Sequence, residues 1–99
     1  MHIQEFQERI EKLYLDRDRD RGIERTFAWF VEEVGELAKA INRKKDDGGK
    51  NLREEFADVL AWLVTLASLH GISVEDAAEE KYGKGCPKCG GTPCHCPKA

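Results

Sequence analysis

Apolar residues recur at helical spacing near the start of the chain. Four of them stand three or four residues apart: Ile3, Phe6, Ile10 and Leu13. This spacing places them on one side of a helix, so an amphipathic helix is expected over about residues 3–15. The next stretch, residues 16–22, reads DRDRDRG and alternates acids with bases before a glycine. Such a pattern is typical of a solvated loop or a frayed helix end.

A second, longer helix is predicted over about residues 24–45. Its apolar stripe repeats with the period of a helix and consists of Phe27, Phe30, Val31, Val34, Leu37, Ala38 and Ile41. The helix should end before Gly48 and Gly49, because glycine weakens a helix and suits a turn.

A third helix is expected after this turn. Asn51 stands three residues before Glu54, the arrangement of an N-cap with a capping-box partner. The helix should continue to about His70 and close at Gly71. From Phe56 onward it is apolar nearly all round, so we expect protein to cover its sides, partly from other copies of the chain.

The end of the chain differs in composition from the rest. Ser73 is predicted to cap a short fourth helix, VEDAAEEKY, after which glycine, proline, lysine and cysteine dominate. We therefore expect two parts: an all-α helix bundle of about four helices over residues 1–82, and a small cysteine-rich, metal-binding tail over 83–99. A bundle of this size buries itself only marginally, so oligomerisation or a staple should complete it.

Charge and hydropathy exclude several classes of partner. The net charge is −3, with acids and bases interspersed, so nucleic acid is not expected as the main ligand. Charged residues recur from Glu5 onward, which argues against a signal peptide. The longest apolar run, inside residues 56–69, is too short and interrupted to span a bilayer. These features predict a soluble cytoplasmic protein without a membrane partner.

Acidic residues on the two central helices stand out against their apolar surroundings. They form two pairs with a three-residue spacing: Glu33 with Glu36, and Glu55 with Asp58. Members of each pair lie about 60° apart on a helix, and a tryptophan, Trp29 or Trp62, stands one turn away. If the helices pack antiparallel, the pairs face each other, and the carboxylates would repel unless a cation lay among them. All-oxygen ligands favour Mg²⁺ or Mn²⁺.

Not every acid on these helices requires a metal ion. Glu32 and Glu54 suit a solvated helix face. Asp58 does not, because the VLAWLVTLASL run after it offers no polar face, and an ion pair with Arg53 or a lysine is the alternative to metal. A di-iron bundle would require Glu-x-x-His pairs, which neither helix has.

The combination of EEVGE at residues 32–36 and EFAD at 55–58 resembles the EExxE and ExxD motifs of the MazG-like nucleotide pyrophosphohydrolases. The resemblance extends over about residues 3–82. It implies an all-α, dimeric or tetrameric enzyme that hydrolyses nucleoside triphosphates, NTP or dNTP, to a monophosphate and pyrophosphate, in nucleotide-pool house-cleaning. It also implies Mg²⁺ ligands, namely Glu33, Glu36, Glu55 and Asp58. Glu32 would activate water or support these ligands.

Substrate contacts are less constrained by the sequence. Trp29 and Trp62 suit either base stacking or the core. Arg21, Arg25 and Lys81 could meet phosphates. In similar proteins a lysine of the last helix is followed by an asparagine and an arginine, whereas here glycines and the tail follow Lys81. The preferred base and sugar therefore stay open.

The tail contains all four cysteines of the chain in a C-x2-C-x4-C-x-C pattern: Cys86, Cys89, Cys94 and Cys96. This spacing predicts a tetrahedral, structural zinc site that fastens the tail to the helical body. The alternatives are three thiolates with His95, an iron–sulfur cluster, disulfides or free thiols. A different functional class also stays open, namely a non-catalytic zinc-knuckle module that binds a protein or RNA through lysines such as Lys84, Lys88 and Lys98.

Overall fold

The computed structural model describes residues 1–43 and 46–98. Four helices run through these residues: α1 (Ile3–Arg21), α2 (Ile23–Arg43), α3 (Lys50–Leu69) and α4 (Val74–Tyr82). The described part of the chain contains no strand. The predicted all-α fold of four helices is therefore confirmed. The predicted end of the second helix, residues 44–45, lies outside the described residues.

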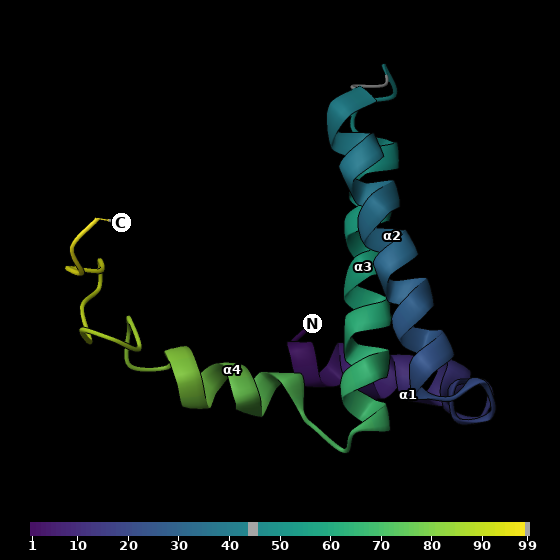
Figure 1. Ribbon diagram of the computed structural model, residues 1–99, viewed down its shortest axis with the longest axis horizontal. Coiled ribbons are helices and arrows are strands. Elements are labelled where there is room, and N and C mark those ends of the chain that lie inside the picture. Colours follow the sequence, from purple (N-terminus) through teal and green to yellow (C-terminus); the bar gives the residue numbers. More distant parts are fainter. Residues whose placement is uncertain (44–45, 99) are drawn as a thin grey trace.

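The helices form a corner (Figure 1). α2 and α3 lie side by side as an antiparallel hairpin, and α1 crosses the base of this hairpin. α4 contacts α1, runs away from the hairpin and carries the tail at its far end. The Cα radius of gyration is 16.2 Å, whereas a compact domain of about 100 residues has about 13 Å. A single chain is therefore more extended than a compact domain of its length.

α1 is longer than the sequence pattern predicted. The DRDRDR stretch is helical to its last residue, so of the two alternatives for residues 16–22 the loop is wrong except at Gly22, and the stretch is the end of the helix. Asp18 and Arg21 form an ion pair of 2.9 Å one turn apart, and the basic side chains of Arg19 and Arg21 suit the negative end of the helix. Gly22 then adopts φ 86°, which favours glycine, and separates α1 from α2.

The start of α3 also differs from the prediction. Gly49 occupies the N-cap position with φ 81°, and Asn51 lies inside the helix, so Asn51 is not the N-cap. The carboxylate of Asp47 accepts hydrogen bonds from the backbone N–H groups of Gly49 and Asn51, both at 3.0 Å. Asp47 thus satisfies two backbone donors at the start of the helix, the kind of role that the sequence assigned to Asn51.

The end of α3 and the start of α4 follow the prediction. α3 ends at Leu69, and Gly71 adopts φ 70° in the turn that follows. The Oγ of Ser73 accepts the backbone N–H of Asp76 at 3.2 Å, which confirms Ser73 as the cap of α4.

A buried amide joins this turn to α1. Gln7 is 2 % exposed. Its Nε2 donates to Ser68 Oγ at 3.0 Å and to the carbonyl of Ile72 at 2.8 Å, while its Oε1 accepts the N–H of Val74 at 3.0 Å. One side chain therefore fixes where α3 ends and α4 begins.

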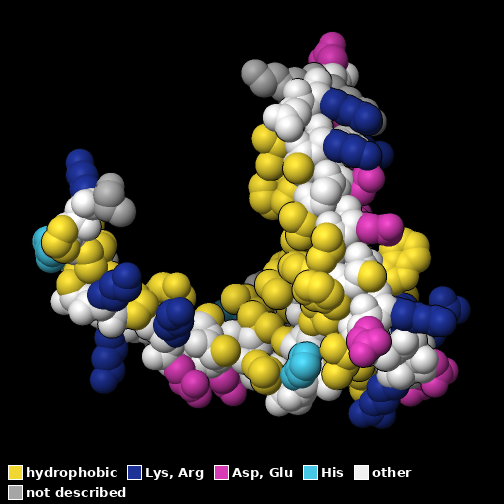
Figure 2. Space-filling view, viewed as in Figure 1, with side chains coloured by type: hydrophobic (Ala, Val, Ile, Leu, Met, Phe, Trp, Pro, Cys, Tyr) yellow, Lys and Arg dark blue, Asp and Glu magenta, His cyan; other side chains and the backbone are white. Residues whose placement is uncertain are grey.

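The apolar core of a single chain is small. Among the described residues only three apolar side chains are buried: Ile10, Ala40 and Val64. Phe27 and Phe56 remain 57 % and 55 % exposed, so the chain alone does not provide the cover expected around the third helix. Figure 2 shows apolar side chains gathered along the inner side of the corner. Within the described residues no single helix is long and apolar enough to cross a membrane, although α3 and α4, bent by 95°, pass that test of length and composition as a pair.

Candidate active site

Three carboxylates meet where α2 packs against α3. Glu33 projects from α2, while Glu55 and Asp58 project from α3 one turn apart. Carboxylate oxygens from the three residues all lie within 4.8 Å of one another. The antiparallel hairpin thus brings together three of the four acids in the two predicted pairs. We call Glu33, Glu55 and Asp58 the acid triad.

The electrostatics of the acid triad favour a bound cation. Burial, and then the negative charges of Asp58 and Glu55, raise the pKa of Glu33 above its usual range. Within the described residues, Oε2 of Glu55 is a buried oxygen with no hydrogen-bond partner. A divalent cation among these oxygens would remove the repulsion and supply the missing partner. The donor set therefore fits a hard metal ion.

Glu36 and Glu32 lie beside the acid triad on α2. Both are exposed, and Glu36 pairs with Lys39 at 3.6 Å. Their negative charges also raise the pKa of Glu33, after the larger contributions from the triad. Together with Trp29 and Glu33 they line a hollow of about 490 Å³. The fourth predicted metal ligand is thus next to the triad but outside it.

The two tryptophans form a wall beside these acids. Trp29 lies one turn before Glu33, and Trp62 lies one turn after Asp58. Their rings stack with centroids 6.2 Å apart and planes at 12°. Trp29 is 49 % exposed, so it is not a core residue in the single chain.

Arg21 is held in place by its neighbours. Its guanidinium carbon lies 4.9 Å from the centroid of the Trp62 ring. Its Nη1 donates to Asp18 Oδ1 at 2.9 Å and to Thr26 Oγ1 at 3.4 Å. Asp18 is only 4 % exposed and Thr26 is fully buried. The structure therefore places Arg21 near the tryptophan wall, with its charge compensated by a buried acid.

Sequence reasoning missed Asp18, which it assigned to a solvated stretch. The position of Asp18 on the helix could have indicated its burial. Tyr14 and Asp18 follow Gln7 at intervals of seven and four residues, which places all three on the same side of α1 as Ile10. A polar residue at such a position faces the protein and requires a partner.

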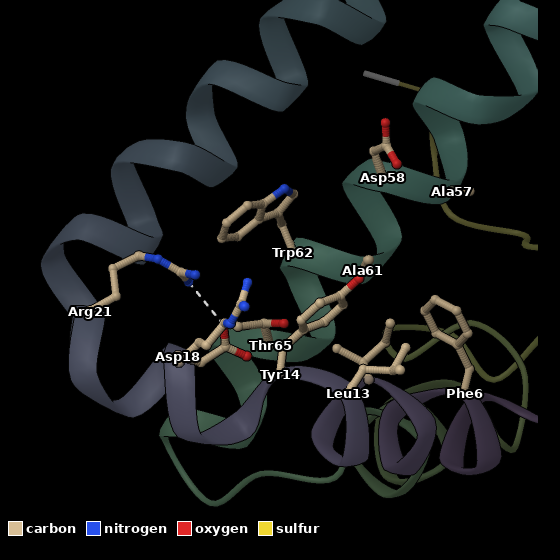
Figure 3. A pocket seen from close by; sticks show the side chains of 12 residues that line it. Phe6, Leu13, Tyr14, Asp18, Arg21, Ala57, Asp58, Ala61, Trp62 and Thr65 are labelled. Atoms are coloured by element: carbon tan, nitrogen blue, oxygen red, sulfur yellow. Dashed lines mark hydrogen bonds and ion pairs between the residues drawn. The ribbon is translucent and has the colours of Figure 1, made fainter.

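A cleft of about 460 Å³ is lined by residues of α1 and α3 (Figure 3). Apolar side chains make up much of its lining: Phe6, Ile10, Leu13, Tyr14 and Trp62. Asp58 borders the cleft on α3, and the ion pair of Asp18 with Arg21 borders it on the far side of Trp62. The cleft thus adjoins the acid triad through a residue that they share, Asp58.

The remaining predicted phosphate contacts lie apart from the acid triad. Arg25 is exposed in the first turns of α2, two turns before Glu32. Lys81 is on α4, with its Nζ 5.6 Å from the centroid of the Tyr82 ring. Because α4 runs away from the hairpin, a single chain does not bring Lys81 to the acids.

The four cysteines form a second cluster. The structure holds Cys86, Cys89, Cys94 and Cys96 as free thiols whose sulfur atoms all lie within 4.8 Å of one another. Backbone N–H groups, first that of His95, lower the pKa of Cys89 to about 6, whereas the other thiols, first that of Cys94, raise the pKa of Cys96 to about 11. Four sulfur ligands and the acid triad thus give the chain two separate groups that could hold metal.

Comparison with known proteins places the chain in a family. The sequence profile described as "MazG nucleotide pyrophosphohydrolase domain" matches residues 21–90, which include both acidic motifs. The chain is also similar to "Uncharacterized protein YpjD" of Bacillus subtilis (strain 168), with 38 % identity over 64 residues, or 58 % of each protein. The profile match crosses residue 82, and the predicted boundary there stays a prediction. The chain belongs to the MazG nucleotide pyrophosphohydrolase family.

Proposed function

We propose that the chain hydrolyses nucleoside triphosphates, NTP or dNTP, to a nucleoside monophosphate and pyrophosphate with Mg²⁺ or Mn²⁺, and so clears unwanted nucleotides. The observation that carries this proposal is the convergence of Glu33, Glu55 and Asp58 in a member of this family, with one buried Glu55 oxygen left without a partner.

The acid triad would hold the metal ion, with Glu36 as a fourth carboxylate from the adjacent turn of α2. When bound, a divalent ion neutralises charge on phosphoryl oxygens and lowers the pKa of an attacking water. Without a metal, the acids would repel the substrate, because both carry negative charge. The proposal therefore explains why so acidic a site would serve an anionic ligand.

Glu32 is the residue proposed to accept the proton of the attacking water. It is exposed and shares the hollow with Glu33 and Trp29, so water reaches it freely. In the reaction the water oxygen bonds to phosphorus, one P–O bond of the α–β anhydride breaks, and pyrophosphate leaves. A carboxylate next to the metal ligands is suited to take up the released proton.

The aromatic wall would bind the base. Trp62 is already in contact with Trp29 and Arg21, so the exposed part of Trp29 is the surface on which a base can stack. Arg21, beside the tryptophan wall, would meet phosphates, as would Arg25 of the first turns of α2 if the triphosphate extends that far from the acids. Lys81 would contribute only if it came from another copy of the chain.

A homodimer or homotetramer is the proposed working form. The exposed phenylalanines of α2 and α3, the small core and the large radius of gyration support this assembly. A second copy seated on these helices would cover apolar surface that the chain leaves open to water.

The experiment that tests the proposal measures products from a panel of ordinary and modified NTPs and dNTPs, with and without Mg²⁺. Pyrophosphate and the matching monophosphate should form in equal amounts and only with metal. The ranking of substrates would identify the base and sugar. Orthophosphate with a diphosphate would contradict the proposed bond cleavage. The absence of product from every nucleotide would favour the alternative of a non-catalytic module that binds a protein or RNA.

A further inference from the structure

The tail arranges its four sulfur atoms at the spacing of a metal-thiolate centre. The Sγ atoms of Cys86 and Cys96 are 3.6 Å apart, and those of Cys89 and Cys94 are 4.0 Å apart. In a zinc site each Zn–S bond measures about 2.3 Å, so a regular tetrahedron of four sulfurs has edges of about 3.8 Å. These two separations lie on either side of that value, and all four sulfur atoms lie within 4.8 Å of one another. The tail thus brings its sulfur atoms close to the spacing that a zinc site requires.

Backbone donors point at these sulfur atoms. The N–H of His95 donates to Cys89 Sγ at 3.2 Å, and the N–H of Cys96 donates to Cys94 Sγ at 3.3 Å. Hydrogen bonds of this kind stabilise the charged thiolate, which is the form that binds metal. Two sulfur ligands therefore have backbone N–H partners that favour the thiolate form.

Tight turns close the tail around the cluster. The N–H of Gly90 donates to the carbonyl of Cys86 at 2.7 Å, and the N–H of Cys86 donates to the carbonyl of Gly91 at 3.0 Å. Gly85 has φ 101°, and a Cβ atom there would lie 2.8 Å from the Gly90 carbonyl oxygen and from Thr92 Oγ1. The turn before Cys86 therefore requires glycine.

His95 stands outside the cluster. The group of side chains that converge contains the four cysteines and not this histidine. The imidazole lies instead over the backbone of Gly91, where a Cβ atom would be 2.6 Å from its Cδ2. The structure thus favours four thiolates over three thiolates with an imidazole, and four sulfur ligands leave no coordination position for a substrate.

The position of the tail limits what the metal can stabilise. Figure 1 shows the tail beyond the far end of α4, away from α1, α2 and α3. The tail adjoins the last turn of α4 through a hollow lined by Glu79, Lys84 and Cys86. Most tail side chains are exposed, so the segment has no apolar core of its own. The sequence predicted a staple for the helical body, whereas this placement allows a metal to fold only the tail.

We propose that Cys86, Cys89, Cys94 and Cys96 bind one Zn²⁺ in a closed tetrathiolate site, and that the ion folds residues 83–98 without stabilising the helices. This inference does not depend on the proposed nucleotide hydrolysis, because it concerns other side chains. Metal binding and folding are coupled in small domains that lack a core. The ion replaces the core that the tail does not have.

The test uses the full chain, freed of metal and then titrated with Co²⁺ in the presence of excess Mg²⁺, which competes with Co²⁺ for the oxygen ligands of the acid triad. One equivalent of Co²⁺ should produce the visible absorption of a tetrahedral thiolate site, and one equivalent of Zn²⁺ should abolish it. Cys94→Ser should weaken zinc binding by more than about a hundredfold, since even the loss of an outer partner costs up to that factor. His95→Ala is the matched control and should leave the absorption and the affinity unchanged.

Several results would overturn the proposal. Equal damage from His95→Ala and Cys94→Ser would show that the imidazole is a ligand. Iron with sulfide in the purified protein, or a mass four hydrogens lower than that of the reduced chain, would show a cluster or two disulfides instead. The folding part is tested by melting the helices with circular dichroism, where zinc removal should not change the midpoint. Amide signals of residues 83–98 should lose their dispersion in the same sample. A lower helix midpoint would show that zinc staples the bundle.

Discussion

The acid triad and the cysteine cluster are two groups of possible metal ligands built in opposite ways. Glu33 and Asp58 are 25 residues apart in the sequence and meet because α2 packs against α3. All four cysteines lie within residues 86–96 and meet through local turns. Helix packing supports the acids whether or not an ion is present. The turns of the tail have no such packing, and in our proposal a bound ion provides the support instead.

The two groups also differ in how the surrounding structure affects the charge of the ligands. In the acid triad the fold holds like charges together in a partly buried place, and burial and then the neighbouring acids raise the pKa of Glu33. In the tail, backbone N–H groups donate to the sulfur atoms of Cys89 and Cys94, while the neighbouring thiols raise the pKa of Cys96. Metal at the acids should therefore matter most for chemistry, and metal at the cysteines most for local folding. Substitutions that remove single side chains can test this contrast.

The largest effect should come from Asp58→Asn. The substitution removes one ligand charge at nearly constant shape from an exposed position, so the helices should form normally. Metal ions contribute several kcal/mol to transition-state stabilisation, and a loss of about 4 kcal/mol corresponds to a fall in kcat/KM of about a thousandfold. The rate of pyrophosphate release at saturating Mg²⁺, compared between parent and variant, measures the fall in kcat/KM.

Glu54→Gln is the matched control for that experiment. Glu54 is exposed on the same helix, directly before Glu55, but is not part of the acid triad. Its substitution should leave kcat/KM within about a factor of two, which corresponds to the ±0.5 kcal/mol typical of surface changes. Equal activity in both variants would remove Asp58 from the site.

A smaller effect, this time on stability, is expected from Gln7→Ala. The change removes the three hydrogen bonds that join α1 to the turn between α3 and α4, and leaves the Ile72 carbonyl and the Val74 N–H without their partner. A buried polar group left without a hydrogen-bond partner costs about 1–3 kcal/mol, so the free energy of unfolding should fall by about 2–4 kcal/mol. Urea denaturation of the parent and the variant measures this difference.

Glu8→Ala provides the control, because Glu8 is the exposed neighbour of Gln7 on α1. Its substitution should change the free energy of unfolding by no more than about 0.5 kcal/mol. If Gln7→Ala behaved like this control, the amide would not be what fixes α4 to α1.

Gln7 and Asp18 also show where sequence reasoning stops. The helices and the acid triad were predictable, because apolar period, three-residue spacing and a short connection determine which faces meet. Both polar residues lie on the buried side of α1. The partner of Gln7, Ser68, comes from α3, whereas Asp18 pairs with Arg21 of its own helix, and Arg21 in turn donates to Thr26 of α2. Hydropathy alone cannot indicate that such a partner will be present.

The covering of α3 could not be predicted for a different reason. The sequence indicates that apolar side chains such as Phe56 will be covered, but it does not say by which chain. In the structure Phe56 remains 55 % exposed.

The cap of α3 could not be predicted either. It depends on Gly49 in a left-handed conformation, which gives the capping role to Asp47 in place of Asn51.

The smallest effect should appear in the pH dependence of stability. The raised pKa of Glu33 means that the folded chain binds this proton more tightly than the unfolded chain does. The resulting contribution to stability is fully present below about pH 4, the ordinary carboxyl range, and is lost as the pH rises through the raised pKa. At neutral pH, metal-free protein should therefore gain stability from Glu33→Gln.

The gain should not exceed about 1 kcal/mol, because Glu33 is only partly buried and water screens its neighbours. Thermal melts of the parent and of Glu33→Gln at pH 7 and pH 4, both without metal, measure it, with Glu24→Gln on the exposed start of α2 as control. The difference in melting temperature between parent and variant should shrink as the pH falls, since Glu33 of the parent then carries its own proton.

Mg²⁺ at pH 7 should raise the melting temperature of the parent more than that of the variant, because it relieves the same repulsion. A variant that melts below the parent at pH 7 without metal would show that Glu33 is held by favourable contacts, and the acid triad would then resemble the cysteine cluster.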